Sequence, residues 1–157
     1  MANSMEIRME IQGLDQAIKK LKLYDSKSRK KIEAAISKAG RNIRDGAKTR
    51  VPIRTGGLRD SIDARFNSGK LQSVIKPNYR KSPHARLGHL IEFGASEVVI
   101  APKKKKFLKF TVDGETVFTK KPIEIPERKP RPFMNPAFQA EKPKIEAEIE
   151  KIIKEMP

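Results

Sequence analysis

His89 and Glu92, in the stretch HLIE, are the residues whose spacing is best suited to chemistry. Three residues apart, they would share one face of a helix, where an imidazole and a carboxylate can bind a metal ion or exchange protons. The chain has only one other histidine, His84, and no cysteine, so a complete set of metal ligands would need distant carboxylates. The pattern therefore favours a structural Glu92, ion-paired with one of the many arginines, and predicts neither a metal nor a cofactor.

The glycines Gly56 and Gly57, in RTGGL, suggest a second chemistry, the binding of a phosphate by backbone N–H groups. They do not follow a predicted strand, however, and the trailing G-K-[ST] of a phosphate loop is missing. A G-x-S-x-G nucleophile turn and a paired-carboxylate motif are missing as well. These observations favour a protein that is not an enzyme.

A run of four lysines suggests a third chemistry, contact with nucleic acid phosphates. The run consists of Lys103, Lys104, Lys105 and Lys106. The whole chain carries 35 basic and 19 acidic residues, a net charge of +16, and the excess is spread along the chain. Against DNA binding, only 6% of the residues are aromatic and none is Trp, which leaves little stacking surface. A solvated loop explains the lysines equally well, so a basic nucleic-acid-binding module remains the alternative function.

The elements that position these residues begin with a strand over residues 5–11, where apolar and charged residues alternate. Helical spacing follows over residues 14–21 and again from Asp25 and Ser26, which are suitable helix caps. The second helix has one apolar stripe, formed by Ile32, Ala35, Ile36, Ala39, Ile43 and Ala47. Its other faces are basic, so we expect this long amphipathic helix to be the centre of the fold.

The stretch VPIRTGGLRDSI, residues 51–62, ends that helix. Pro52 disfavours helical geometry at Val51, so the helix should end near Arg50. Thr55 is expected to accept backbone hydrogen bonds as a cap, and Gly56 and Gly57 permit a tight turn. A short helical turn with Leu58 and Ile62 should then lead into a strand near residues 64–67.

The middle of the chain alternates between strands and loops. We expect a turn at 67–70, a strand at 71–76, an exposed loop at 77–86 and a short helix from Leu87 to Phe93 that Gly94 ends. Three more strands are predicted at 97–100, 107–112 and 116–119, the last two joined by Asp113-Gly114, a strong hairpin signal. The proline-rich residues 122–132 should form an extended connector.

The last helix is predicted to begin at Asn135, with Pro136 in the first helical position, and to break or kink near Glu141 because of Pro143. In the preceding RPFMNPAF, Phe133 and Phe138 can anchor this helix on the core, or the aromatics and Arg131 can meet a neighbouring subunit. Both interpretations, a core anchor and a contact between subunits, stay open.

These elements predict one α+β domain over residues 1–157, with an antiparallel or mixed sheet packed against the long basic helix and a C-terminal helix. Its parts are a strand and two helices (1–50), a sheet-rich part with loops (51–134) and the last helix (135–157). No apolar run reaches the length of a membrane span and no signal segment is evident, so we expect a soluble protein made in the cytoplasm.

Three ordered motifs, VPIRTGGLRDSI, HLIEFGA and RPFMNPAF, resemble those of the tail-completion and head-tail joining proteins of long-tailed bacteriophages, a family akin to the Z-type minor tail proteins of lambdoid phages. The family patterns P-x-x-T-G-x-L-x-x-S, E-F-G-T and P-F-x-x-P-A match named positions here. These are Pro52, Thr55, Gly56, Leu58 and Ser61; Glu92, Phe93 and Gly94; and Pro132, Phe133, Pro136 and Ala137. Ala95 stands where the family usually has Thr.

The resemblance implies a structural protein of a phage or prophage virion, made in the bacterial cytoplasm and located at the neck. It implies a ring of identical subunits, hexameric in the virion, that joins the connector or stopper to the tail terminator or tube proteins, with transient contact to genomic DNA and none to a membrane. It also implies assembly roles for the motif residues, namely Pro52, Thr55, Gly56, Leu58, Glu92, Phe93, Gly94, Pro132, Phe133 and Pro136. The basic surface is compatible with acidic neighbours or with DNA.

Overall fold

The computed structural model describes residues 7–9, 26–103, 106–112 and 114–155. In chain order the elements are β1 (Ile7–Met9), α2 (Ser26–Arg50), α3 (Gly57–Ser61), β2 (Ile62–Asn67), β3 (Gln72–Pro77), the 3-10 helix η1 (Pro83–Leu87), α4 (Gly88–Phe93), β4 (Val98–Ile100), β5 (Leu108–Val112), β6 (Glu115–Thr119), β7 (Ile123–Ile125) and α5 (Met134–Lys154). All paired strands are antiparallel, so the predicted α+β class is confirmed. The helix expected at 14–21 lies outside the described residues, as does most of the strand expected at 5–11.

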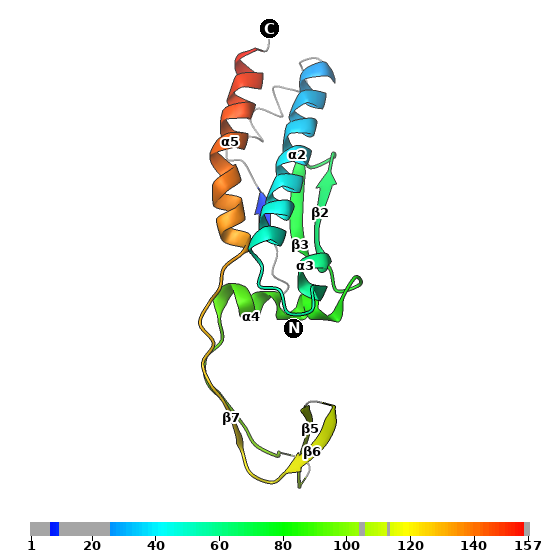
Figure 1. The fold of residues 1–157 in the computed structure, drawn as a ribbon. Helices are drawn as coiled ribbons and strands as arrows, with labels where there is room; N and C mark the ends of the chain where they lie inside the picture. Colours follow the sequence, from blue (N-terminus) through cyan, green and yellow to red (C-terminus); the bar gives the residue numbers. More distant parts are fainter. Residues whose placement is uncertain (1–6, 10–25, 104–105, 113, 156–157) are drawn as a thin grey trace.

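Helix α2 is the centre of the fold, as its apolar stripe predicts. It lies between α5 on one side and the three-stranded sheet β1-β3-β2 on the other (Figure 1). The helix ends at Arg50, as expected, and the N–H of Val51 makes the last helical hydrogen bond, 3.0 Å to the carbonyl oxygen of Ala47. The buried apolar core contains Ile32, Ala35, Ile36, Ala39, Ile43, Ala47, Val51, Leu58, Ile62, Leu71, Ile75, Phe133, Met134, Ala137, Ile145 and Ile149.

Strands β2 and β3 form the hairpin predicted by the alternation of their residues. Ala64 faces Ile75 and Phe66 faces Ser73 in the register. One face of this pair packs on α2 and carries the buried Ile75, while the other face carries Asp63, Arg65 and Val74. Because successive side chains of these strands point to opposite faces of the sheet, one face joins the core and the other forms a polar outer face.

The exposed loop predicted at 77–86 is correct for most of its residues but wrong in part. It contains the start of η1, where the hydroxyl of Ser82 accepts a hydrogen bond from the N–H of His84 at 3.2 Å. Ala85 is buried. Pro83 in the first helical turn and Ser82 as the cap were the available sequence signals for this short helix.

Helix α5 differs from its prediction in two respects. It begins at Met134 after Phe133, with no side-chain cap from that residue, so Asn135 is not the cap. It also runs without a break through Pro143 to Lys154. The packing of Ile145 and Ile149 on the core, and a hydrogen bond of 2.7 Å from Asn42 Nδ2 to Glu141 Oε1, hold the two sides of Pro143 against α2.

Residues 96–127 form an arm that extends away from the rest of the molecule, which we call the body (Figure 1). Its stem is the strand pair β4 and β7, and its distal hairpin is the pair β5 and β6. The three strands predicted here are confirmed, but β7 was missed inside the connector expected at 122–132. Ile123-Glu124-Ile125 alternates over only three residues between two prolines, too short a run to stand out.

Within the described part of the chain, no helix combines the length and apolar character needed to cross a bilayer.

Candidate assembly site

The first motif forms the turn between α2 and α3. Gly56 is the residue before the helix and has a φ of 79°, a left-handed conformation that favours glycine. The predicted cap at Thr55 is wrong, because Gly56 takes the cap position and Thr55 is exposed at the surface. Leu58 is buried and fixes α3 to the core.

The second and third motifs meet through one carboxylate. Glu92, at the end of α4, is only 4% exposed. Its Oε2 accepts hydrogen bonds from the N–H groups of Phe133 (2.7 Å) and Met134 (2.9 Å), and its Oε1 accepts one from Asn135 (2.8 Å). These N–H groups have no partner within the helix, and the negative charge is favoured at the positive end of the α5 dipole. Glu92 therefore caps α5 from another helix.

Glu92 thus has a different role from the predicted ion pair with an arginine, and that prediction is wrong. Both of its oxygens accept hydrogen bonds from backbone N–H groups. Across the described residues, no cluster of three His, Cys, Asp or Glu side chains could hold a metal ion.

Next to this carboxylate, the chain leaves the body and returns to it. Ala95 and Arg128 form an isolated antiparallel bridge, with N···O distances of 3.0 and 2.8 Å, and the N–H of Arg131 bonds the carbonyl oxygen of Ile91 at 2.7 Å. Gly94 makes the approach possible. It has φ 77° and ψ −175°, and a Cβ atom there would lie 2.5 Å from the carbonyl oxygen of Arg128.

The three motifs converge on one surface groove of about 590 Å³. Its lining includes Pro52 from the first motif, Leu90 and Ile91 from the second and Arg131 from the third. Leu87, Glu127, Arg128 and Lys129 complete the lining. Leu87 is 43% exposed, and the nearby motif residues Ile53 and Phe93 are 62% and 72% exposed. The lining therefore combines four apolar residues with three basic residues and the acidic Glu127.

The motif residues divide into two groups by exposure. Leu58, Glu92 and Phe133 are buried, so they shape the body and cannot touch another molecule directly. Phe133 anchors α5 in the core, which is the first of the two interpretations given above for the aromatic residues of this motif. Phe138 is partly buried and packs against the same core. The exposed or partly exposed residues are Pro52, Thr55, Gly56, Phe93, Gly94, Pro132 and Pro136.

The stem of the arm has an apolar face with no covering layer. In the register of β4 and β7, Val98 faces Ile125 and Ile100 faces Ile123, so these four side chains share one face of the ribbon. Val98 and Ile100 are 50% and 41% exposed. Val99 and Glu124 lie on the opposite face. Sequence reasoning missed this face because its second strand, β7, was not recognised.

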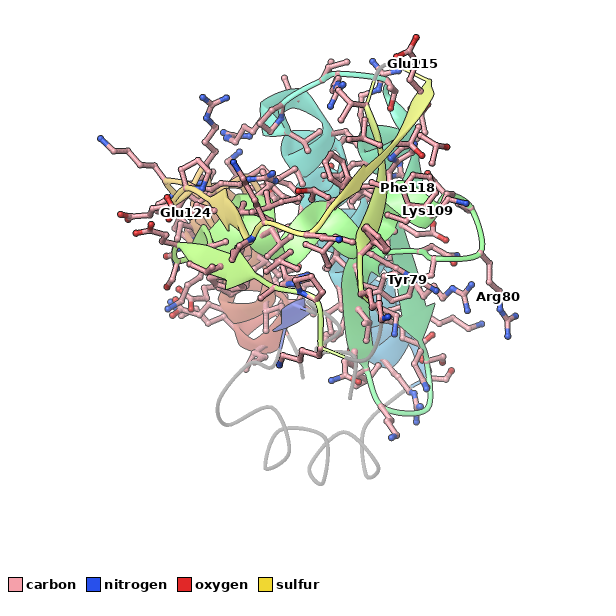
Figure 2. All side chains as sticks on the ribbon, turned by 90° about the horizontal axis from the view of Figure 1, so that it is seen from below. Tyr79, Arg80, Lys109, Glu115, Phe118 and Glu124 are labelled. Atoms are coloured by element: carbon pink, nitrogen blue, oxygen red, sulfur yellow. The ribbon has the colours of Figure 1, made fainter. Side chains whose placement is uncertain are left out.

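The hairpin is amphipathic as well. Leu108, Phe110, Val112 and Val117 lie on one face, together with Glu115 and Thr119 near its two ends, according to the register of β5 and β6. On the other face, Lys109 Nζ lies 5.9 Å from the centre of the Phe118 ring, and Lys120 Nζ lies 5.0 Å from that of Phe107. Figure 2 shows Lys109 beside Phe118, with Glu115 at the end of the hairpin and Glu124 on the stem. Of the lysine run, Lys103 and Lys106 are exposed, and Lys104 and Lys105 lie outside the described residues.

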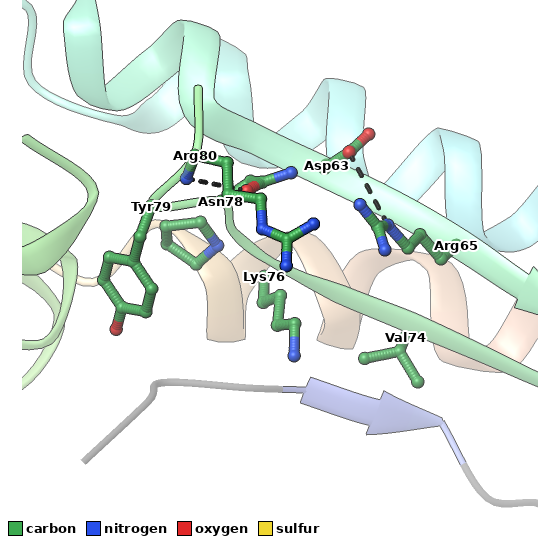
Figure 3. A pocket seen from close by; sticks show the side chains of 8 residues that line it. Asp63, Arg65, Val74, Lys76, Asn78, Tyr79 and Arg80 are labelled. Carbon is green, nitrogen blue, oxygen red and sulfur yellow. Dashed lines mark hydrogen bonds and ion pairs between the residues drawn. The ribbon is translucent and has the colours of Figure 1, made fainter. Parts of the chain in front are cut away.

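A second cavity, of about 350 Å³, lies on the outer face of β2 and β3 (Figure 3). Asp63 is its acidic residue, 3.2 Å from Lys81 Nζ and 4.0 Å from Arg65 Nε. Partial burial by itself would raise the pKa of Asp63, but hydrogen bonds and the attraction of Lys81 outweigh burial, so the pKa is lowered. Asp63 therefore forms ion pairs with Lys81 and Arg65 at this cavity.

Comparison with known proteins agrees with this arrangement. The family model described as "Bacteriophage HK97-gp10, putative tail-component" matches residues 15–94, just over half of the chain. The matched range contains the first motif and reaches Gly94, the residue at which the arm leaves the body. No curated protein and no solved structure matches the chain. Because this match covers more than half of the chain, the protein belongs to the HK97-gp10-like family of bacteriophage tail components and has a structural role in the phage.

Proposed function

We propose that the protein completes the tail and joins it to the head, acting at the neck of a tailed phage or prophage as a ring of identical subunits, sixfold like the tail. The observation that carries this proposal is the uncovered apolar face of the stem, formed by Val98, Ile100, Ile123 and Ile125. A two-stranded ribbon is at best marginally stable in water, so it needs a surface to pack on. A neighbouring subunit supplies such a surface in a ring.

Charge favours the groove of the next copy as that surface. The stem carries Glu97 and Glu124, and neither makes an ion pair within the described part of the chain. The groove is lined by apolar residues and by three basic residues, Arg128, Lys129 and Arg131, which outnumber its one acidic residue, Glu127. Apolar area and opposite charges therefore match when the stem of one copy lies on the groove of the next.

The geometry of that contact favours a closed assembly. The stem and the groove are different surfaces of the same chain, so their contact is heterologous and repeats from copy to copy until the rotation closes. The Ala95–Arg128 bridge and the Glu92 cap fix the base of the stem, so each copy presents its arm at the same angle. The exposed motif residues Pro52 and Phe93 then lie at the contact.

The test is the mass of the assembly, measured by light scattering and native mass spectrometry, with electron microscopy of negatively stained samples. The protein is measured alone and mixed with the tail-tube and connector proteins of its phage. Rings are expected under the proposal. Salt-sensitive binding to DNA without any partner, and no ring under either condition, would favour the basic nucleic-acid-binding module instead.

Paired variants locate the contact. Val98→Thr combined with Ile100→Thr keeps the β propensity but removes apolar surface from the proposed contact face, and ring formation should be lost. Val99→Thr is the matched control on the opposite face of the same strand, and it should form rings as the wild type does. Rings that persist in the double variant would show that the stem is not the contact.

A further inference from the structure

The distal hairpin has a different chemistry from the stem. From residue 103 to residue 121 the sequence contains seven lysines and two acidic residues, Asp113 and Glu115, a net charge of +5. In the described part of the hairpin and its flanks, no lysine is in an ion pair, and Lys103, Lys106, Lys109 and Lys120 are exposed. Stem and hairpin therefore have charges of opposite sign.

The hairpin also has an apolar face that nothing in the subunit covers. Val112 and Val117 on this face are 47% and 38% exposed, and Leu108 and Phe110 are partly exposed. An isolated two-stranded hairpin of five residues a strand does not hold its shape well in water. A partner that covers Leu108, Phe110, Val112 and Val117 would stabilise it.

We propose that the hairpin docks into an acidic groove with one apolar wall on a different virion protein, while the stem contacts the next copy of this chain. This inference rests on the proposed function, and it adds a second contact, between the hairpin and another protein of the virion. The apolar face would lie on one wall of the groove, and carboxylates on the opposite wall would meet Lys109 and Lys120 on the other face of the hairpin.

The described residues of a second copy do not offer that groove. Most carboxylates of the described residues are already in ion pairs or bound to backbone N–H groups. Those without such a partner are Glu97, Glu115, Glu124, Glu127 and Glu148, and only Glu148 belongs to the body. The whole chain has a net charge of +16, so a second copy would repel a hairpin with an excess of five positive charges.

DNA would neutralise the lysines of the hairpin but would not cover its apolar face. Phosphates would neutralise Lys106 and Lys109, yet the phosphate backbone gives no apolar surface to cover Val112 and Val117. The exposed aromatic rings Phe107 and Phe118 lie on the other face, each with a lysine over it. An aliphatic face on one side of the hairpin and lysines on the other therefore favour a protein partner, which can supply both apolar surface and carboxylates.

Site-specific photo-cross-linking in assembled particles tests the proposal. The photoreactive residue p-benzoylphenylalanine replaces Val117 on the apolar face of the hairpin, and Ala147 on the exposed side of α5 as the control position. After irradiation, mass spectrometry identifies the adducts. We expect the Val117 position, and not the Ala147 position, to cross-link to another virion protein within a segment rich in Asp and Glu.

Charge reversal completes the test. Lys106→Glu combined with Lys109→Glu should lower the yield of that adduct on the order of tenfold or more, since each lost charge pair weakens the contact. Lys30→Glu combined with Lys38→Glu, on the exposed side of α2, is the matched control and should leave the yield unchanged. Adducts with a second copy, with DNA, or with nothing would each overturn the proposal.

Failure of this inference can be told apart from failure of the proposed function. The hairpin variants should form rings of wild-type mass when the protein is measured without the docking partner, because the stem is intact. If rings form but the hairpin cross-links to a second copy or to DNA, only the docking partner is wrong. If no ring forms under any condition, the proposed function itself is wrong.

Discussion

Three backbone N–H groups at the start of α5 converge on one side chain, the carboxylate of Glu92, and this is the residue on which the corner of the body depends. The distances of 2.7, 2.9 and 2.8 Å are those of charge-assisted hydrogen bonds. The carboxylate joins a motif near residue 92 to another near residue 133. Without it, N–H groups of buried Phe133 and Met134 would have no acceptor.

We predict that Glu92→Ala lowers the free energy of unfolding by about 2–4 kcal/mol, because buried donors lose a charged acceptor. Glu92→Gln keeps the shape and one acceptor oxygen and should lose about 1–2 kcal/mol. Urea denaturation followed by circular dichroism gives these values. Glu124→Ala, an exposed carboxylate of the stem, is the control and should stay within about 0.5 kcal/mol of wild type. An equally small effect for Glu92→Ala would contradict the capping role.

Gly94 allows a second prediction at this scale. Gly94→Ala should lower the free energy of unfolding by about 2–4 kcal/mol, because it combines backbone strain with a clash against the carbonyl oxygen of Arg128. Gly114 has a similar φ of 88°, and nothing lies within 4 Å of a Cβ there. Gly114→Ala therefore carries only the conformational cost of about 1 kcal/mol. Equal losses in the two variants would show that the approach of Arg128 is not tight.

Residue roles at this corner could be predicted only in part from the sequence. The resemblance to the phage family gave Glu92, Gly94 and Phe133 assembly roles, but the predicted partner of Glu92 was an arginine. Glu92 and the N–H groups it binds are about 40 residues apart in sequence. Their contact depends on how α4 and α5 pack, which no local pattern contains.

At the scale of elements, local patterns predicted most helices and strands well. The 3.6-residue stripe and Pro52 located α2 and its end at Arg50, and Asp113-Gly114 located the turn between β5 and β6. The errors lie where tertiary packing decides. Packing on α2 keeps α5 continuous through Pro143, and pairing with β4 makes a strand of Ile123–Ile125.

Pro143 gives a prediction for α5. It is exposed in the middle of the helix, where a proline removes one hydrogen bond and crowds the preceding turn. Pro143→Ala should raise the free energy of unfolding by about 1–3 kcal/mol. For a chain of this length the melting temperature would rise by roughly 2–4 °C per kcal/mol.

The measurement is calorimetry, with Glu148→Ala on the same helix as the control. Glu148 is also exposed, so its replacement should change stability by less than about 0.5 kcal/mol. A lower melting temperature in Pro143→Ala would mean that the proline fits α5 better than a regular turn does.

For the whole molecule, the division into body and arm leads to a further prediction. Ala95 and Arg128 are joined by two backbone hydrogen bonds, so a four-residue Gly/Ser linker can replace residues 96–127. The shorter loop costs less entropy to close, and the core of the body loses no buried residue. The shortened protein should therefore melt within a few degrees of wild type but form no rings.

Calorimetry and light scattering on the same sample separate these two outcomes. A shortened protein that forms rings would place the contacts on the body. One that fails to fold would show that the arm is part of the folding unit, contrary to the separation of core and arm.

One pair of hydrogen-bonded residues, Ala95 and Arg128, joins the arm to the body. The sequence of the arm can therefore diverge while the structure of the body stays the same. Recombination between phage genomes within the codons for residues 96–127 would yield a virion protein with the same body and an arm that binds different partners. Compatibility between heads and tails of different phages would then be inherited through one short exchangeable segment.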